Sequence, residues 1–215
     1  MTHRGGPYGA PLILFLAVAA AAEDVRSTVG PVETPLPLEA ANFLLDHPDL
    51  SAWLVNRRKI APYVVERRSP KRFFADDGDG TKGLITEAER SPTRRVYQGE
   101  GTHNGWLEAD ATVVLQLAPA GPGCVISTFD VGVTLKNRLL GGAVRLLRPW
   151  LKDVIARKFG RAFLAAHKVG ELLAREPASV SAELASYPKL TEAERAELLR
   201  VTGSLVGAAG CPKKL

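Results

Sequence analysis

The sequence is poor in the residues that build small specialised folds. It has two cysteines, one methionine and four histidines among its 215 residues. So few cysteines exclude a disulfide-rich miniprotein and a cysteine-rich zinc module. The histidines form no His-Glu-x-x-His or Cys/His cluster, and no serine lies in a Gly-x-Ser-x-Gly motif. We therefore expect no metal, no cofactor and no serine-hydrolase chemistry.

Long apolar runs are also scarce. The longest spans residues 12–22, well short of the roughly 20 apolar residues of a membrane-spanning helix. It follows Arg4 and ends in alanines before Glu23 and Asp24, which is typical of a secretory signal peptide and its cleavage site. We predict that residues 1–22 are a cleaved signal peptide and that the protein is secreted or periplasmic. A retained anchor is the alternative.

Export would change the meaning of the two cysteines. In an oxidising compartment Cys124 and Cys211 can form one disulfide, which would pin the C-terminal tail to the sheet. The alternative is two free thiols. Because the sequence gives no distance between the two cysteines, both alternatives stay open.

The overall composition is that of a globular domain. With 46% hydrophobic and 24% charged residues, wholesale disorder is excluded. The length allows one domain with appendages or two small domains. A single domain of this size buries enough surface to fold without a metal.

Charge is distributed unevenly along the chain. The net charge is +5, and loss of Arg4 with the signal peptide leaves +4. Residues 136–175 hold ten basic and two acidic residues, a net charge of +8, so the rest of the mature chain carries −4. This basic segment either docks on an anionic surface such as a phospholipid bilayer or pairs with the acidic sheet. We expect no nucleic-acid partner, because export and the absence of a recognised motif argue against one.

Hydrophobic periodicity changes twice along the chain. Residues 23–37 are rich in proline and predict a linker or an edge strand, and two short helices follow, interrupted by His47 and Pro48. From residue 60 the period is two, which indicates an antiparallel sheet with one buried face. The predicted strands are residues 63–68, 72–75, 83–90, 94–103, 108–117 and 124–135.

The period then becomes helical. Residues 149–175 predict a helix about 40 Å long, which can cross the apolar face of the sheet. Pro149 either kinks this helix or starts it. We expect residues 177–215 to be a C-terminal extension with one short helix, opened by a capping box of Thr191 and Glu194.

The element order, together with the helix–turn–helix at residues 40–53, resembles the helix-grip fold of the START-like (SRPBCC) superfamily, which includes polyketide cyclases and Bet v 1-like proteins. The resemblance covers residues 38–176 and implies an α+β fold, in which a curved antiparallel sheet grips a long C-terminal helix. It also implies a hydrophobic cavity between sheet and helix, where members bind lipids, sterols or polyketides.

We therefore expect an exported protein that holds a hydrophobic ligand, such as a lipid, sterol or isoprenoid, and that can carry it to or from a membrane. The period of the strands and the helix gives the candidate ligand-binding residues Tyr97, Val113, Leu115, Phe129, Val131, Leu151, Phe159 and Phe163. The candidate membrane-docking residues are Arg145, Arg148, Lys152, Arg157, Lys158 and Arg161. The oligomeric state is left open.

Two other functions stay possible on the sequence. A cyclase or aromatase acting in the same cavity would need ionisable groups pointing inward, for which Glu100, His103 and Asp130 are the candidates. A protein-interaction module with a filled core is the third possibility. The acidic segment 76–81 has some features of a calcium loop, but its spacing and flanking strands indicate a hairpin turn.

Overall fold

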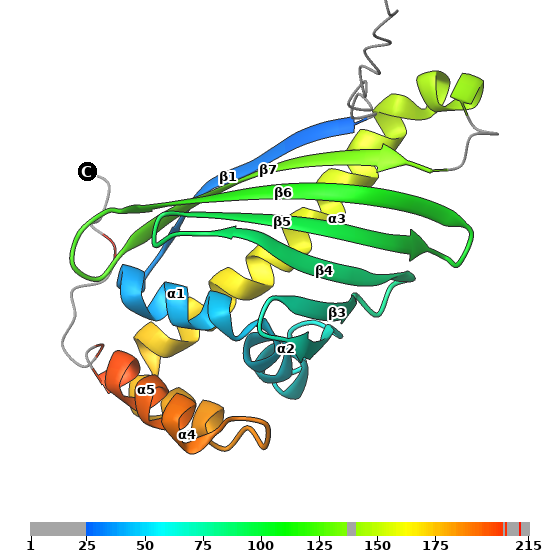
Figure 1. Cartoon of the computed structure of the whole chain (residues 1–215). Helices are drawn as coiled ribbons and strands as arrows, with labels where there is room; N and C mark the ends of the chain where they lie inside the picture. The colour runs from blue at the N-terminus through cyan, green and yellow to red at the C-terminus, as the bar shows by residue number, and fades with distance from the viewer. Residues whose placement is uncertain (1–24, 137–140, 204, 206–210, 212–215) are drawn as a thin grey trace, which may run out of the picture.

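The structure, a computed structural model, describes residues 25–136, 141–203, 205 and 211, with backbone only for 141–152. The predicted signal peptide therefore lies outside the described residues. Seven strands and five helices are present in the described part of the chain (Figure 1). The strands are β1 (Val25–Thr34), β2 (Val64–Ser69), β3 (Arg72–Asp76), β4 (Thr81–Arg90), β5 (Arg94–His103), β6 (Leu107–Pro119) and β7 (Val125–Leu135). The helices are α1 (Leu38–Asp46), α2 (Pro48–Arg57), α3 (Gly141–Arg175), α4 (Pro177–Ala185) and α5 (Glu192–Gly203).

All seven strands form one antiparallel sheet in the order β1-β7-β6-β5-β4-β3-β2. Consecutive strands from β2 to β7 are neighbours, as short turns between them require. The proline-rich segment after the predicted signal peptide forms β1, so the edge-strand alternative is the one observed. It pairs with β7, the last strand along the chain, and forms one edge of the sheet.

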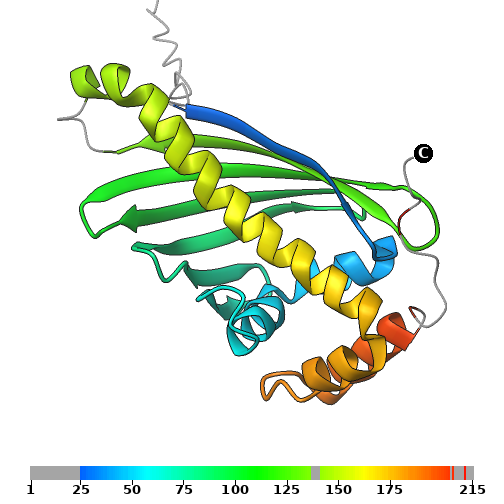
Figure 2. The same ribbon diagram turned by 180° about the vertical axis from the view of Figure 1, so that it is seen from behind.

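Helix α3 crosses the sheet diagonally, as Figure 2 shows. It begins at Gly141, eight residues before Pro149, so this proline lies inside the helix and the kink is the alternative observed. The first turns of α3 run at an angle to the rest (Figures 1 and 2), as expected where a proline removes a backbone hydrogen bond. The α+β helix-grip arrangement predicted from the sequence is thus confirmed.

The face of the sheet that meets α3, here called the inner face, is identified by one aromatic pair. The rings of Phe129 on β7 and Phe163 on α3 meet edge to face with centroids 4.3 Å apart. Register then places the cross-strand partners of Phe129 on the same face, namely Leu115 on β6 and, through it, Arg95 on β5. Alternate residues along each strand therefore face α3.

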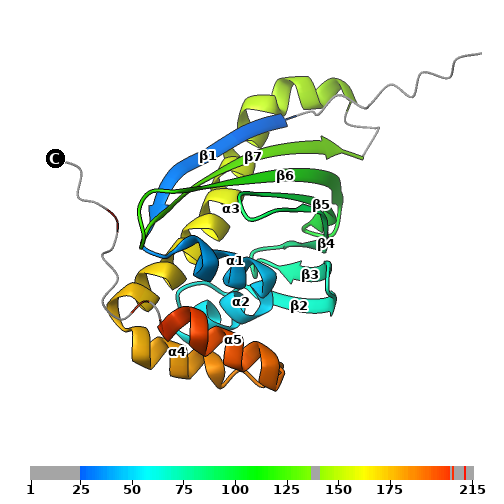
Figure 3. The same ribbon diagram turned by 60° about the vertical axis from the view of Figure 1, so that its left-hand side comes forward.

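The other helices gather at one end of the sheet (Figure 3). Buried side chains of α1, α2, α4, α5 and the last turns of α3 form one apolar core, which includes Leu50, Leu54, Val169, Leu184 and Leu198. The C-terminal extension is thus part of the fold's main core and packs on the body rather than hanging from it.

The expectation of one short helix in this extension is wrong, because α4 precedes α5. The segment is rich in proline, serine and alanine and carries little periodic signal. Its helix is held by tertiary packing, since Val180 and Leu184, four residues apart, are fully buried against the core.

Cys124 and Cys211 form a disulfide across a sequence separation of 87 residues. Cys124 lies next to the start of β7 and is fully buried. The bond therefore ties the end of the chain to the sheet, which is the first of the two alternatives left open by the sequence.

The capping box predicted at Thr191 is formed. The backbone N–H of Glu194 donates to Thr191 Oγ1 (3.2 Å), and that of Thr191 donates to Glu194 Oε2 (2.8 Å). We expect Thr191→Ala to lower the free energy of unfolding by about 1 kcal/mol, because it removes the side-chain acceptor of the Glu194 N–H at the start of α5. Chemical denaturation checks this, and an unchanged midpoint would contradict it.

Candidate functional site

The inner face and α3 bring together most of the residues predicted to bind a ligand. Tyr97, Val113 and Val131 are cross-strand neighbours in one row, and Leu115 and Phe129 lie in the next. Phe163 of α3 packs on Phe129 and is buried, whereas Phe159 is half-buried. The side chain of Leu151 lies outside the described residues. Their contact with a ligand stays a prediction.

The middle of the inner face is lined by small residues. Gly99 on β5 and Ala111 on β6 are paired in register. The three atoms nearest to a Cβ built on Gly99 are Leu84 O (3.7 Å) and the Cβ and O of Ala111 (both 3.9 Å), and all belong to the sheet. Within the described residues, the close backbone contacts of α3 with the sheet fall on β1. No atom of α3 lies nearer to that Cβ than these three atoms of the sheet.

One end of the inner face carries a buried ion pair that the sequence analysis missed. The Arg95 guanidinium donates to Glu87 Oε1 (2.9 Å), and both residues are only 2–3% exposed. Arg95 also bonds to Asp46 and to Asn42 Oδ1 (2.6 Å), both on α1. Burial opposes the charge on Arg95, but these bonds outweigh it and raise its pKa. The pair therefore holds α1 on the sheet.

Alternation along β5 is the signal that could have found this pair. Arg95 lies two residues before Tyr97, on the same inner stripe, and Glu87 is the cross-strand partner of Tyr97. The phenol of Tyr97 is buried next to the pair, and burial raises its pKa to about 12. It is therefore a neutral hydroxyl at physiological pH.

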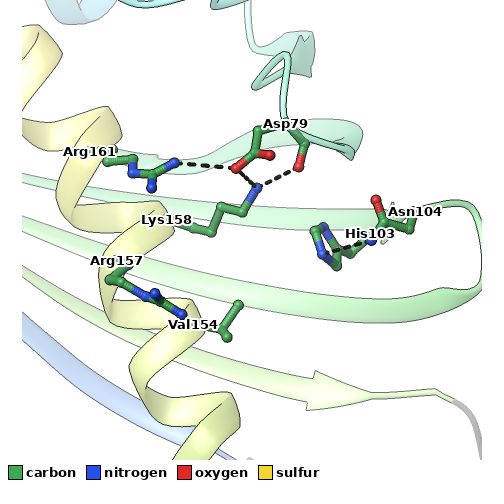
Figure 4. A pocket seen from close by; sticks show the side chains of 7 residues that line it. All are labelled: Asp79, His103, Asn104, Val154, Arg157, Lys158 and Arg161. Carbon is green, nitrogen blue, oxygen red and sulfur yellow. Dashed lines mark hydrogen bonds and ion pairs between the residues drawn. The ribbon is translucent and has the colours of Figure 1, made fainter.

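The opposite end of the site holds a hollow of about 260 Å³ (Figure 4). It lies between α3, the β3–β4 loop and the tip of the β5–β6 hairpin. Figure 4 shows side chains of all three segments converging on it. Its lining is Asp79, His103, Asn104, Val154, Arg157, Lys158 and Arg161. Positive charge therefore predominates there.

The β3–β4 loop is ion-paired to α3 beside this hollow. Lys158 Nζ donates to Asp77 Oδ2 (2.8 Å) and Asp79 Oδ2 (2.9 Å), and Arg161 donates to Asp79 Oδ2 (3.2 Å). These four residues are here called the loop–helix ion cluster. The segment 76–81 is a hairpin turn, as predicted, and its carboxylates bind cationic side chains.

The loop–helix ion cluster neutralises part of the positive charge of α3. Lys158 and Arg161 pair with acidic residues of the sheet side, which is the alternative to a free docking face. Among the described residues Arg157 makes no ion pair, and its Nε donates to the Asp153 carbonyl oxygen (3.4 Å). The side chains of Arg145, Arg148 and Lys152 lie outside the described residues.

The loop–helix ion cluster predicts an acid-sensitive stability. Bonds from Lys158 lower the pKa of Asp79 and, against the effect of burial, that of Asp77. A carboxylate with a lowered pKa stabilises the fold above its unfolded value, 3.8, and the effect is lost as the pH falls below it. We expect Asp77→Asn/Asp79→Asn to lower the thermal midpoint by about 2–4 °C at pH 7. The difference should shrink below pH 4, and a constant difference would contradict the assignment.

The candidate catalytic residues do not converge. Glu100 and Asp130 are exposed on the outer face, where Asp130 accepts a bond from Thr28. His103 faces inward, but both of its ring nitrogens are engaged. Nδ1 lies 2.9 Å from Thr81 Oγ1, and Nε2 lies 3.2 Å from the amide nitrogen of Asn104, which can only donate. His103 is thus held in a fixed orientation at the hollow.

Neither a metal site nor a membrane-spanning helix is found among the described residues. No group of three or more histidine, cysteine, aspartate or glutamate side chains could hold a metal ion there. Nor is any helix in that part of the chain both long and apolar enough to cross a membrane.

The architecture decides which fold this is. One antiparallel sheet wraps a long C-terminal helix, and two short helices lie between β1 and β2. The fold is the START-like helix grip. No family model and no curated protein matches the chain.

Several solved structures are similar to this helix grip. A START superfamily protein from Mycobacterium smegmatis has a TM-score of 0.47 and 15% identity, over 69% of this chain and 97% of its own. Truncated norcoclaurine synthase from Thalictrum flavum has a TM-score of 0.48 and 10% identity, over 67% and 93%. The di-domain ARO/CYC protein StfQ of the steffimycin biosynthetic pathway has a TM-score of 0.46 and 18% identity, over 71% and 53%. At these identities the likeness concerns the fold alone.

Proposed function

We propose that the protein binds a hydrophobic molecule between the inner face of its sheet and α3. The observation that carries this proposal is the middle of the inner face, where Gly99 and Ala111 present almost no side chain and the atoms nearest to a Cβ built on Gly99 belong to the sheet and not to α3. The half-buried side chains of Tyr97, Val113 and Phe129 surround this part of the face. Apolar surface that remains partly exposed in a concavity is typical of ligand sites.

The START-like helix grip supports the same proposal. The fold is shared with a START superfamily protein and with an ARO/CYC protein of a biosynthetic pathway.

We further propose that the protein is exported and exchanges its ligand at an anionic membrane. The signal-peptide pattern of residues 1–22 supports export, and a disulfide fits an oxidising compartment. The net charge of +8 on residues 136–175 supports attraction to anionic lipid, at about 1 kcal/mol for each side chain that reaches the surface. Cosedimentation with anionic but not zwitterionic vesicles is the expected result. Equal cosedimentation with both, or none, would contradict the membrane step alone.

Ligand binding is tested on the purified mature protein. Native mass spectrometry should detect a co-purifying hydrophobic molecule, and the delipidated protein should bind the neutral dye Nile red at one saturable site. A clean apo mass together with no saturable uptake would reject the proposal and favour a module with a filled core.

A further inference from the structure

The hollow at the end of the site has a cationic lining with one unpaired member. Three of its seven lining residues are basic and one is acidic. Even with Asp77 counted, which also binds Lys158, the net charge around the hollow is +1. A cation-lined concavity attracts anions, because its low-dielectric walls concentrate the field.

The positive charge that remains available belongs to Arg157. Lys158 and Arg161 are held by Asp79, and Lys158 by Asp77 as well. Arg157 has no carboxylate within ion-pair distance among the described residues and bonds only to a backbone carbonyl of its own helix. Its side chain is exposed and projects from α3 next to Val154, as Figure 4 shows. A guanidinium in this state can bind a carboxylate or phosphate with two parallel hydrogen bonds.

The hollow and the apolar part of the site lie along the same face of β5. His103 at the hollow and Tyr97 at the deep end lie on the same stripe of β5, six residues apart, which is about 20 Å of strand. Gly99 and Gly101 lie between them on that stripe. Val154 adds an apolar side chain to the rim. A molecule lying along β5 would thus have an apolar environment along its length and a cation at its end.

We propose that the site takes an anionic amphiphile, an apolar molecule with one acidic group, and that Arg157 binds that group. This proposal rests on the proposed function, whose ligand class it narrows. His103, fixed by Thr81 and Asn104, shapes the hollow beside the acidic group. The carboxylate or phosphate stays at the solvent-exposed end, so its hydration is only partly lost, while the apolar part is buried.

Calorimetric titration with matched probes tests this proposal. The probes are decanoate, decan-1-ol, and the free anions acetate and inorganic phosphate, each below its aggregation limit. We expect wild-type protein to bind decanoate roughly tenfold or more tightly than decan-1-ol, the gain of a charge-assisted hydrogen bond, and to bind the free anions much more weakly.

Variants assign the preference to Arg157. In Arg157→Gln, decanoate binding should weaken roughly tenfold while decan-1-ol binding stays unchanged, and Arg157→Glu should favour the alcohol. Arg175→Gln, an exposed arginine at the far end of the same helix, should behave as wild type. Circular dichroism confirms that each variant is folded.

The outcomes separate this inference from the proposed function. Equal binding of acid and alcohol, unaffected by Arg157→Gln, would overturn the anion site and leave hydrophobic binding intact. Phosphate or acetate binding as tightly as decanoate would show a site for free anions and overturn the amphiphile. Failure of every probe would overturn the anionic amphiphile, and the proposed function would then be decided separately by Nile red uptake and native mass spectrometry.

Discussion

We expect Gly99→Leu to abolish uptake of a hydrophobic ligand and to leave the fold intact. The new side chain enters the room between the inner face and α3, because the atoms nearest to a Cβ at this position all belong to the sheet. About 1.4 kcal/mol of steric cost is enough to weaken binding tenfold, and a leucine in the middle of the site exceeds this. Leucine in place of glycine inside a strand does not harm folding where space is available. Nile red titration and thermal unfolding give the two readouts.

Gln98→Leu is the matched control for this variant. The substitution introduces the same side chain one residue earlier on β5, where alternation places it on the exposed outer face. It should bind ligand as wild type does. A Gly99→Leu protein that binds normally, or that unfolds while Gln98→Leu does not, would show that the middle of the inner face is not an open ligand site.

We expect Arg95→Met to lower the free energy of unfolding by about 3 kcal/mol. The substitution leaves Glu87 Oε1 buried without its donor, and it removes the bond to Asn42 and one of the two arginine contacts that join Asp46 of α1 to the sheet. Breaking a buried ion pair from one side is strongly destabilising, and the lower end of the usual range applies because Arg90 still bonds to Glu87 Oε2 (2.8 Å). Denaturant unfolding measures the loss.

Two further variants separate the buried pair from a general effect of charge. Arg95→Met/Glu87→Leu should recover most of the lost stability, since replacing both partners of a buried pair with apolar residues is often nearly neutral. Arg94→Met should change stability by less than about 0.5 kcal/mol, because Arg94 pairs with Glu89 on the exposed outer face. A loss in Arg95→Met no larger than in Arg94→Met would contradict the structural role of the pair.

Local periodicity was enough to predict most of the fold. The alternation along β6 and β7 and the helical period of α3 are set by which side chains are buried, so they can be read directly from the sequence. The start of α3 stayed open between two alternatives, because a proline at a helix boundary and a proline in a kinked helix give the same local signal; the helix begins at Gly141. Helix α4 was missed because contacts with distant segments stabilise it.

The polar parts of the site depend on long-range register and could not be predicted in the same way. That Glu87 faces Arg95 follows from the pairing of β4 with β5, which has a bulge between Glu87 and Glu89. That Asp79 neutralises Lys158 follows from the angle at which α3 crosses the sheet, across 79 residues of sequence. The apolar wall residues were identifiable because one face of each strand is apolar, whereas the ion pairs have no such local signature.

The most direct test of the account is where a bound ligand touches the protein. A fatty acid carrying a diazirine on its chain is bound to the delipidated protein and photolysed, and the labelled peptides are identified by mass spectrometry. The account predicts labels on inner-face residues of β5, β6 and β7, such as Val113 and Phe129, and on Phe159 or Phe163 of α3. Labels confined to the outer face of the sheet, or labelling that Gly99→Leu does not reduce, would contradict it.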